Sequence, residues 1–202
     1  LKRYVFHESG VLVSGIIGGL YSSTATISVL ARKSRKASEQ EANEYVAAML
    51  LAVSMMFLRF MILILIFSRE IFTSIYPYLL IMSVVAAVVA WFIHSRHRRS
   101  KDMADESEDE DSSNPLEFKV ALIFATLFVV FTVLTHYTLV YAGTGGLNLL
   151  SFVSGLSDIT PFILNLLQNT GSVAVLVVVA CSMQAIISNI LVNMFYALFF
   201  AG

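Results

Sequence analysis

The sequence predicts an all-α fold: a polytopic helical membrane protein with two broken or re-entrant segments and internal pseudo-symmetry. Of its 202 residues, 57% are hydrophobic and 13% are charged, whereas soluble domains have an apolar share of about half and a charged share of about a quarter. Runs of about 20 apolar residues, the length that crosses a bilayer, recur along the chain. Two of these runs carry polar residues through their middles, where each polar group costs free energy unless protein or water satisfies it.

Six membrane segments are expected from the apolar runs. Four of them are plain and two are interrupted by small and polar residues. In chain order the segments are residues 10–31 (interrupted), 45–67, 76–93, 118–141, 147–168 (interrupted) and 173–200.

The first interrupted segment reads GVLVSGIIGGLYSSTATISVLA. Its glycines have the spacing that lets helix backbones approach closely, which explains Gly15 and Gly19 by packing alone. Packing explains the four hydroxyl residues less well, because they cannot all face one neighbour. Where a transport helix unwinds, freed carbonyls and hydroxyls coordinate cations. We therefore expect a broken, site-lining segment here, formed by Ser22, Ser23, Thr24 and Thr26.

The second interrupted segment contains SGLSDITP, in which Ser154 and Gly155 precede Asp158, Thr160 and Pro161. Proline removes a backbone donor and disfavours the helical state of the residue before it, so an interruption is expected at Thr160. Asp158 has two compatible interpretations: a cap for a half-helix that begins at Pro161, or a carboxylate at a binding site. A matching Ser-Gly pair in the first interrupted segment suggests two halves built on a related plan.

Three further polar residues lie among apolar neighbours. Arg59 in the second segment costs roughly 2.5 to 3.5 kcal/mol at the centre of a membrane helix unless it is paired or snorkels. It either snorkels toward an interface or faces the interior, with Asp158 as its partner. Asn165 and Asn189 recur with other polar residues on single helical faces, which favours a water-accessible surface over helix association alone.

The charged residues set the topology and the domain boundaries. Basic clusters at residues 32–36 and 96–101 are separated by two crossings, so the positive-inside rule places both in the cytoplasm of a multi-pass cell-membrane protein. Residues 1–95 form the first membrane half and residues 117–202 the second. Between them, residues 96–116 form a charged cytoplasmic linker with the composition of a disordered segment. The chain begins at Leu1 with basic residues, so we expect a further helix before it.

Five motifs carry a resemblance to a known family: GIIGGLYSSTATISVLARKSR, LAVSMMFLRF, NPLEFKVALIFAT, VSGLSDIT and ISNILVN. Through them the chain resembles the uncharacterised membrane domain found C-terminal to MgtC/SapB domains in bacterial and archaeal proteins. The resemblance implies another helix before this region. The chain departs from that family's pattern at Thr160-Pro161, where a second acidic residue is usual, and at Asn193, where a lysine is frequent.

The leading functional hypothesis is a membrane channel or secondary transporter for an ion or small polar solute, with its site at mid-membrane between the two interrupted helices. A cation fits Asp158 and the hydroxyl cluster, and an anion fits Arg59 with helix N-termini. The alternative is a non-transporting membrane regulatory or assembly partner. We expect no enzyme, because no GxSxG, HExxH or GxGxxG pattern occurs. We also expect no cofactor and no nucleic-acid partner; the expected partners are the bilayer, the solute and a second copy of the chain. Whether a metal binds stays open.

Overall fold

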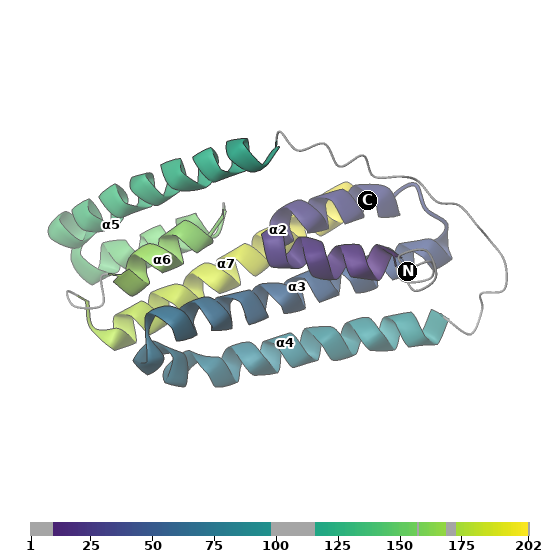
Figure 1. Ribbon diagram of the computed structural model, residues 1–202, viewed down its shortest axis with the longest axis horizontal. Helices are drawn as coiled ribbons and strands as arrows, with labels where there is room; N and C mark the ends of the chain where they lie inside the picture. Colours follow the sequence, from purple (N-terminus) through teal and green to yellow (C-terminus); the bar gives the residue numbers. More distant parts are fainter. Residues whose placement is uncertain (1–9, 98–115, 157, 169–172, 202) are drawn as a thin grey trace. The chain divides into compact units, whose positions relative to one another are not determined.

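A computed structural model describes residues 10–97, 116–156, 158–168 and 173–201 (Figure 1). All regular structure in these residues is helical, as the sequence predicts, and five of the helices are long and apolar enough to cross a membrane. The helices are α2 (Gly10–Ser34), α3 (Glu39–Phe67), α4 (Arg69–His97), α5 (Leu116–Ser154), α6 (Thr160–Gln168) and α7 (Val175–Ala201). The protein is therefore a membrane-spanning helical protein. The predicted linker, residues 96–116, lies outside the described residues except at its two ends.

The chain divides into two compact parts. The first part comprises residues 1–100 with 190–202, and the second comprises residues 101–189. The first part thus contains α2, α3, α4 and the end of α7, and the second contains α5, α6 and the beginning of α7. This division differs from the predicted boundaries in assigning the end of the last helix to the first part.

Helix α2 is two half-helices that fold back on each other at Ser22. The backbone of Ser22 is extended, with φ −154° and ψ 105°, and the two stretches of α2 lie side by side in Figure 1. A Cβ added to Gly18, before the break, would overlap the side chain of Thr26, after it. In a straight helix these residues would be about 12 Å apart along the axis. The break predicted from the hydroxyl cluster is therefore confirmed.

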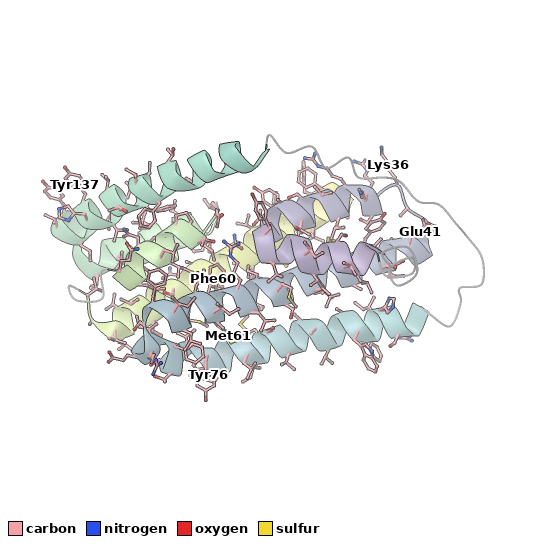
Figure 2. All side chains as sticks on the ribbon, in the orientation of Figure 1. Lys36, Glu41, Phe60, Met61, Tyr76 and Tyr137 are labelled. Atoms are coloured by element: carbon pink, nitrogen blue, oxygen red, sulfur yellow. The ribbon has the colours of Figure 1, made fainter. Side chains whose placement is uncertain are left out.

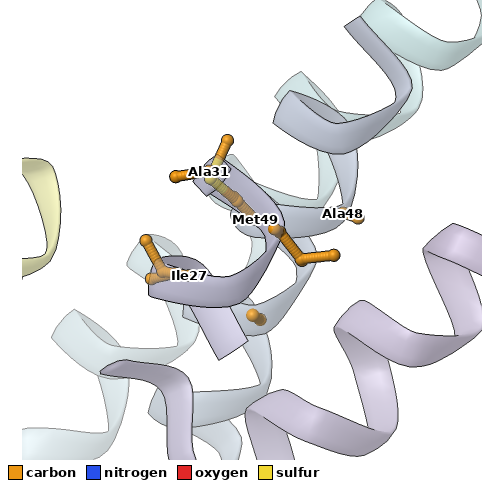
Figure 3. Close-up of a cluster of buried hydrophobic side chains, with 6 residues drawn as sticks. Ile27, Ala31, Ala48 and Met49 are labelled. Carbon is orange, nitrogen blue, oxygen red and sulfur yellow. The ribbon is translucent and has the colours of Figure 1, made fainter. Parts of the chain in front are cut away.

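Helix α3 contacts both half-helices of α2. A Cβ added to Gly15 or Gly19 would overlap the backbone of Ala48 or Ala52, respectively, so small residues on both helices allow this approach. The second half-helix contributes Ile27, Leu30 and Ala31 to a buried cluster with α3. Figure 3 shows members of that cluster at the contact between the two helices.

Helices α3 and α4 form an antiparallel pair joined by the single residue Ser68. The hydroxyls of Ser54 and Ser83, both buried, lie 3.0 Å apart and bridge the two helices. At the start of α3, Ser38 and Glu41 form a capping box that fixes where the helix begins. Figure 2 shows Glu41 near one end of this pair and Tyr76 near the other.

In the second part, α5 bends sharply at Gly143, whose φ of 59° is open to glycine and unfavourable for other residues. The bend divides α5 into a long stretch, 116–142, and a short half-helix, 144–154. Residues 155–159 then connect α5 to α6, which has 9 residues, seven of them buried. The interruption predicted near Pro161 is confirmed, although it lies a few residues earlier.

Candidate functional site

The first break, at Ser22 of α2, is capped by hydroxyl groups of the same helix. The Ser22 hydroxyl oxygen accepts a hydrogen bond from the Ala25 backbone N–H at 3.4 Å, as an N-cap of the second half-helix does. Thr26 Oγ1 donates to the Ser22 carbonyl at 2.8 Å, and the Ser28 hydroxyl donates to the Thr24 carbonyl at 2.8 Å. These hydroxyls therefore satisfy backbone groups of their own helix, which is one purpose that hydroxyls serve inside membranes.

Arg59 binds the end of the first half-helix. Its Nη1 donates to the Tyr21 carbonyl at 2.7 Å. In an unbroken helix that carbonyl would accept from Ala25, whose N–H bonds Ser22 instead. The prediction that Arg59 lies within reach of a polar group is confirmed, but the group is a carbonyl and the side chain is half-buried rather than buried. The pairing of Arg59 with Asp158, which belongs to the second part, stays a prediction.

The predicted hydroxyl cluster differs in burial from one residue to the next. Ser23 is buried, and Ser22, Thr24 and Thr26 are half-buried. Successive helix positions point in different directions, so the four hydroxyls do not share one face. The first part therefore brings together Arg59 and the first break, with Ser22 and Thr26 at its turn.

The second break, between α5 and α6, contains the exposed carboxylate of Asp158. Asp158 Oδ1 accepts a hydrogen bond from the Thr160 backbone N–H at 2.9 Å, and α6 begins at Thr160. This is the Asx-turn geometry by which aspartate caps the start of a helix. The cap interpretation thus has its geometry, with the half-helix beginning one residue before Pro161. The side chain of Asp158 is nevertheless exposed within its own part of the molecule.

Helix α7 binds the other side of the second break. The Ser188 hydroxyl donates to the Phe152 carbonyl at 2.7 Å, and Asn189 Nδ2 donates to the Gly155 carbonyl at 3.2 Å. Both carbonyls lie at the end of α5, where an α-helix leaves its last carbonyls without i+4 donors; that of Phe152 also accepts from the Gly155 N–H at 3.2 Å. Gly155 also touches α7 directly, since an added Cβ would lie 2.9 Å from the Asn189 backbone nitrogen. Asn189, singled out from sequence, is thus placed at the break.

Asn165 faces α5 rather than a solvent-filled space. It is buried in α6, and its Nδ2 donates to Thr132 Oγ1 of α5 at 2.8 Å. Next to this bond, the ring of Phe162 packs against that of Phe131, with centroids 5.7 Å apart. Sequence reasoning did not select Thr132. The signal for Thr132 was a hydroxyl within the apolar run VVFTVLTHY.

Two buried hydroxyls in the second part have no hydrogen-bond partner among the described residues, those of Thr135 in α5 and Ser182 in α7. The backbone around the second break also collects five of the predicted site residues: Ser154, Gly155, Asp158, Thr160 and Asn189. The predicted single site between the two breaks would join both parts of the chain, and it stays a prediction. No group of three or more His, Cys, Asp or Glu residues among the described residues could hold a metal ion.

The two Ser-Gly pairs occupy different places in their half-helices. Gly15 lies well before the break at Ser22 and contacts Ala48 of α3. Gly155 lies at its break and contacts α7. The sequence match therefore does not mark equivalent positions, and internal pseudo-symmetry stays a prediction.

Comparison with known proteins identifies relatives but no activity. The family model described as "Domain of unknown function (DUF4010)" matches residues 1–201. A protein of Aquifex aeolicus (strain VF5), described as an uncharacterized protein, is 27% identical over 195 residues, which cover 95% of this chain and 83% of that protein. No solved structure matches the chain.

Proposed function

We propose that this chain, which belongs to the DUF4010 family, is a channel or secondary transporter for an ion or small polar solute. The observation that carries the proposal is Asp158, an exposed carboxylate between two half-helices. Interrupted helices whose ends meet near the bilayer midplane are the usual architecture of substrate sites in transporters. The association with MgtC/SapB domains and a location in the cell membrane remain part of this proposal.

The depth of Asp158 makes its exposure informative. The half-helix 144–154 spans about 16 Å at the ~1.5 Å rise per residue of an α-helix, about half of a ~30 Å hydrocarbon core. A carboxylate facing lipid at that depth costs about 2.5 to 3.5 kcal/mol on insertion scales, so it is expected to face water or another polar group. The Thr160 N–H donates a hydrogen bond to one oxygen of Asp158. The remaining acceptor capacity of the carboxylate is available to a cation or a proton.

The alternative, a non-transporting regulatory or assembly partner, has one observation in its favour. Gly15 and Gly19 pack directly on the backbone of α3, and Thr26 and Ser28 bond to their own helix. Small and hydroxyl residues used in this way serve helix association without any solute. This observation concerns the first break. At the second break Asp158 caps α6 under either proposal, and its exposed charge, which capping does not require, favours transport.

The test is solute flux in proteoliposomes that contain the purified protein, measured across a panel of monovalent ions, divalent ions and small neutral solutes. Asp158→Asn keeps the volume and much of the capping ability while removing the charge. We expect flux of the transported species to collapse, or to lose its pH dependence, in this variant. Glu70→Gln is the matched control, because Glu70 is an exposed carboxylate in the first turn of α4.

Asp158→Ala separates charge from capping. Loss of the cap should lower stability by about 0.5 to 2 kcal/mol, which is read as a lower thermal unfolding midpoint, whereas Asp158→Asn should unfold close to the wild type. Wild-type flux in the Asn variant at every pH would remove Asp158 from the mechanism. Absence of flux for every solute tested with the wild-type protein would favour the regulatory alternative.

A further inference from the structure

We propose that residues 10–34 and residues 144–168 are re-entrant hairpins: the first enters from the face that carries the basic residues 32–36, and the second enters from the opposite face. The proposal concerns topology, and it holds whether or not the protein transports a solute.

The two ends of α2 lie at the same height along α3. Val11 and Leu12, at its start, pack on the same buried cluster as Leu30 and Ala31, at its end. In a straight helix, Leu12 and Ala31 would be about 28 Å apart. Tyr45, near the start of α3, packs on this cluster too, so both ends of α2 lie where α3 enters the membrane.

The turn of α2 lies deep in the bilayer. Arg59, which binds the Tyr21 carbonyl, lies about 21 Å farther along α3 than Tyr45. The half-helix 10–21 reaches about 18 Å, which agrees with that depth and falls short of the ~30 Å core. Neither half-helix of α2 is therefore long enough to cross.

The second hairpin is fixed by contacts with the helices on either side of it. From 144 to 155 the chain runs parallel to α7, because Asn148 contacts Cys181 at 3.3 Å while Phe152 and Gly155 contact Ser188 and Asn189. The start of α7 therefore lies beside residue 144. Since α5 bends back at Gly143, the end of the stretch 116–142 and the start of α7 lie at the same level.

Three lengths agree on the depth of the second turn. The half-helix 144–154 is about 16 Å long. Along α5, Phe131, whose ring packs on α6, lies about 18 Å from the bend at Gly143. Along α7, Ser188, which binds the end of α5, lies about 20 Å from the start of the helix. The turn thus lies about halfway across the core. Neither the half-helix 144–154 nor α6 crosses the membrane, and α7 crosses it after them.

The count of crossings assigns the faces. From the basic residues 32–36, α3 crosses outward, α4 crosses back, and the stretch 116–142 of α5 crosses outward again, so the second hairpin begins on the outer face. If that hairpin re-enters, α7 ends on the cytoplasmic face. Within the first part, the Arg32 guanidinium indeed lies 4.3 Å from the ring centroid of Phe200, near the end of α7. A crossing hairpin would have put Phe200 on the other face.

Single cysteines in a Cys181→Ser background, labelled by a membrane-impermeant maleimide, test the assignment in right-side-out and inside-out vesicles. Gly10→Cys and Lys36→Cys should react only in inside-out vesicles, and Thr144→Cys and Gln168→Cys only in right-side-out vesicles. Arg69→Cys, one crossing away from Lys36, is the control and should react only in right-side-out vesicles. Reaction of Gly10→Cys and Lys36→Cys from different faces, or of Thr144→Cys and Gln168→Cys from different faces, overturns the proposal.

Cross-linking gives a second measurement that does not depend on access of the label. Asn148→Cys should form a disulfide with the native Cys181 on mild oxidation, whereas Leu149→Cys, which replaces a side chain that is 68% exposed and turned away, should not. Gly18→Cys with Thr26→Cys should also cross-link, since only a straight helix would hold them about 12 Å apart. Failure of both expected cross-links in folded protein overturns the hairpins.

Discussion

In the first part of the chain the interrupted helix turns back over one residue, Ser22, whereas in the second part the segment 155–159 separates the two half-helices. Both breaks release carbonyls, and in both a side chain from the next long helix binds them. The first break receives the cationic Arg59, and the second receives the neutral Ser188 and Asn189. The formal charge at the second break is instead the carboxylate of Asp158. The carbonyls at the two breaks are thus bound by different kinds of donor, and the two turns carry formal charges of opposite sign.

The largest expected effect comes from filling the glycine contacts. Gly19→Ala and Gly155→Ala each place a methyl group against the neighbouring helix, so the helices must separate, at a cost of about 1 to 3 kcal/mol. Gly145→Ala is the matched control, because nothing lies within 4 Å of a Cβ there. Thermal unfolding midpoints in detergent measure all three. A variant at Gly19 or Gly155 as stable as the control would show that its hairpin is loosely packed.

Arg59→Met should be the next largest change. It leaves the Tyr21 carbonyl without its charged donor at 2.7 Å. Loss of a hydrogen bond to a charged group costs about 1.5 to 3 kcal/mol, and the loss here should lie at the low end because Arg59 is half-buried. Arg59→Lys retains a cationic donor and should recover part of that stability. Equal midpoints for the wild type and the Met variant would mean that the first turn does not depend on a charge.

Asn189→Leu removes the corresponding neutral donor at the second break. Hydrogen bonds between membrane helices average about 0.6 kcal/mol, with values up to about 1.7, so this variant should lose less stability than Arg59→Met. Gln184→Leu, an amide replaced on the same helix about one turn earlier, serves as the control. If the Asn189 variant were the less stable of the two break variants, the contrast between a charged and a neutral tether would be wrong.

Ser22→Ala should have the smallest effect, about 0.5 kcal/mol, which is the low end of the range for a lost N-cap, because the bond to Ala25 is 3.4 Å long. Ser28→Ala is the comparison, since its hydroxyl only bonds back to the Thr24 carbonyl. Unfolding midpoints that rank Ser28→Ala below Ser22→Ala would show that the capping hydroxyl is not what defines this turn.

The membrane helices and the two breaks could be predicted from the sequence because their signals are local. Apolar length defines α3 and α7, the hydroxyl cluster marks Ser22, and Pro161 with Gly155 marks the second interruption. The direction of the chain after each break could not be predicted, since it depends on contacts such as Gly18 with Thr26. Nothing in the local pattern distinguishes a kinked crossing helix from a hairpin.

The residue types of the candidate site could be predicted from the sequence, but their main-chain partners could not. Arg59 was expected to reach a polar or acidic partner, and it binds the Tyr21 carbonyl, a partner that no residue type indicates, while its pairing with Asp158 stays a prediction. Asn165 was expected on a water-accessible face, and it is buried against Thr132. Side-chain chemistry indicates which residues need partners inside a membrane, while the freed backbone groups that supply those partners are visible only in the fold.

The order in which the donors and acceptors are synthesised has a consequence for how the protein is made. Arg59 follows Tyr21 by 38 residues, and Ser188 and Asn189 follow Phe152 and Gly155 by 36 and 34. At about 5 to 20 residues per second, each turn leaves the ribosome about 2 to 8 seconds before the helix that completes it. During that interval the carbonyls at each turn lack these side-chain donors. Each turn can therefore take its final hydrogen bonds only after its successor helix has been made.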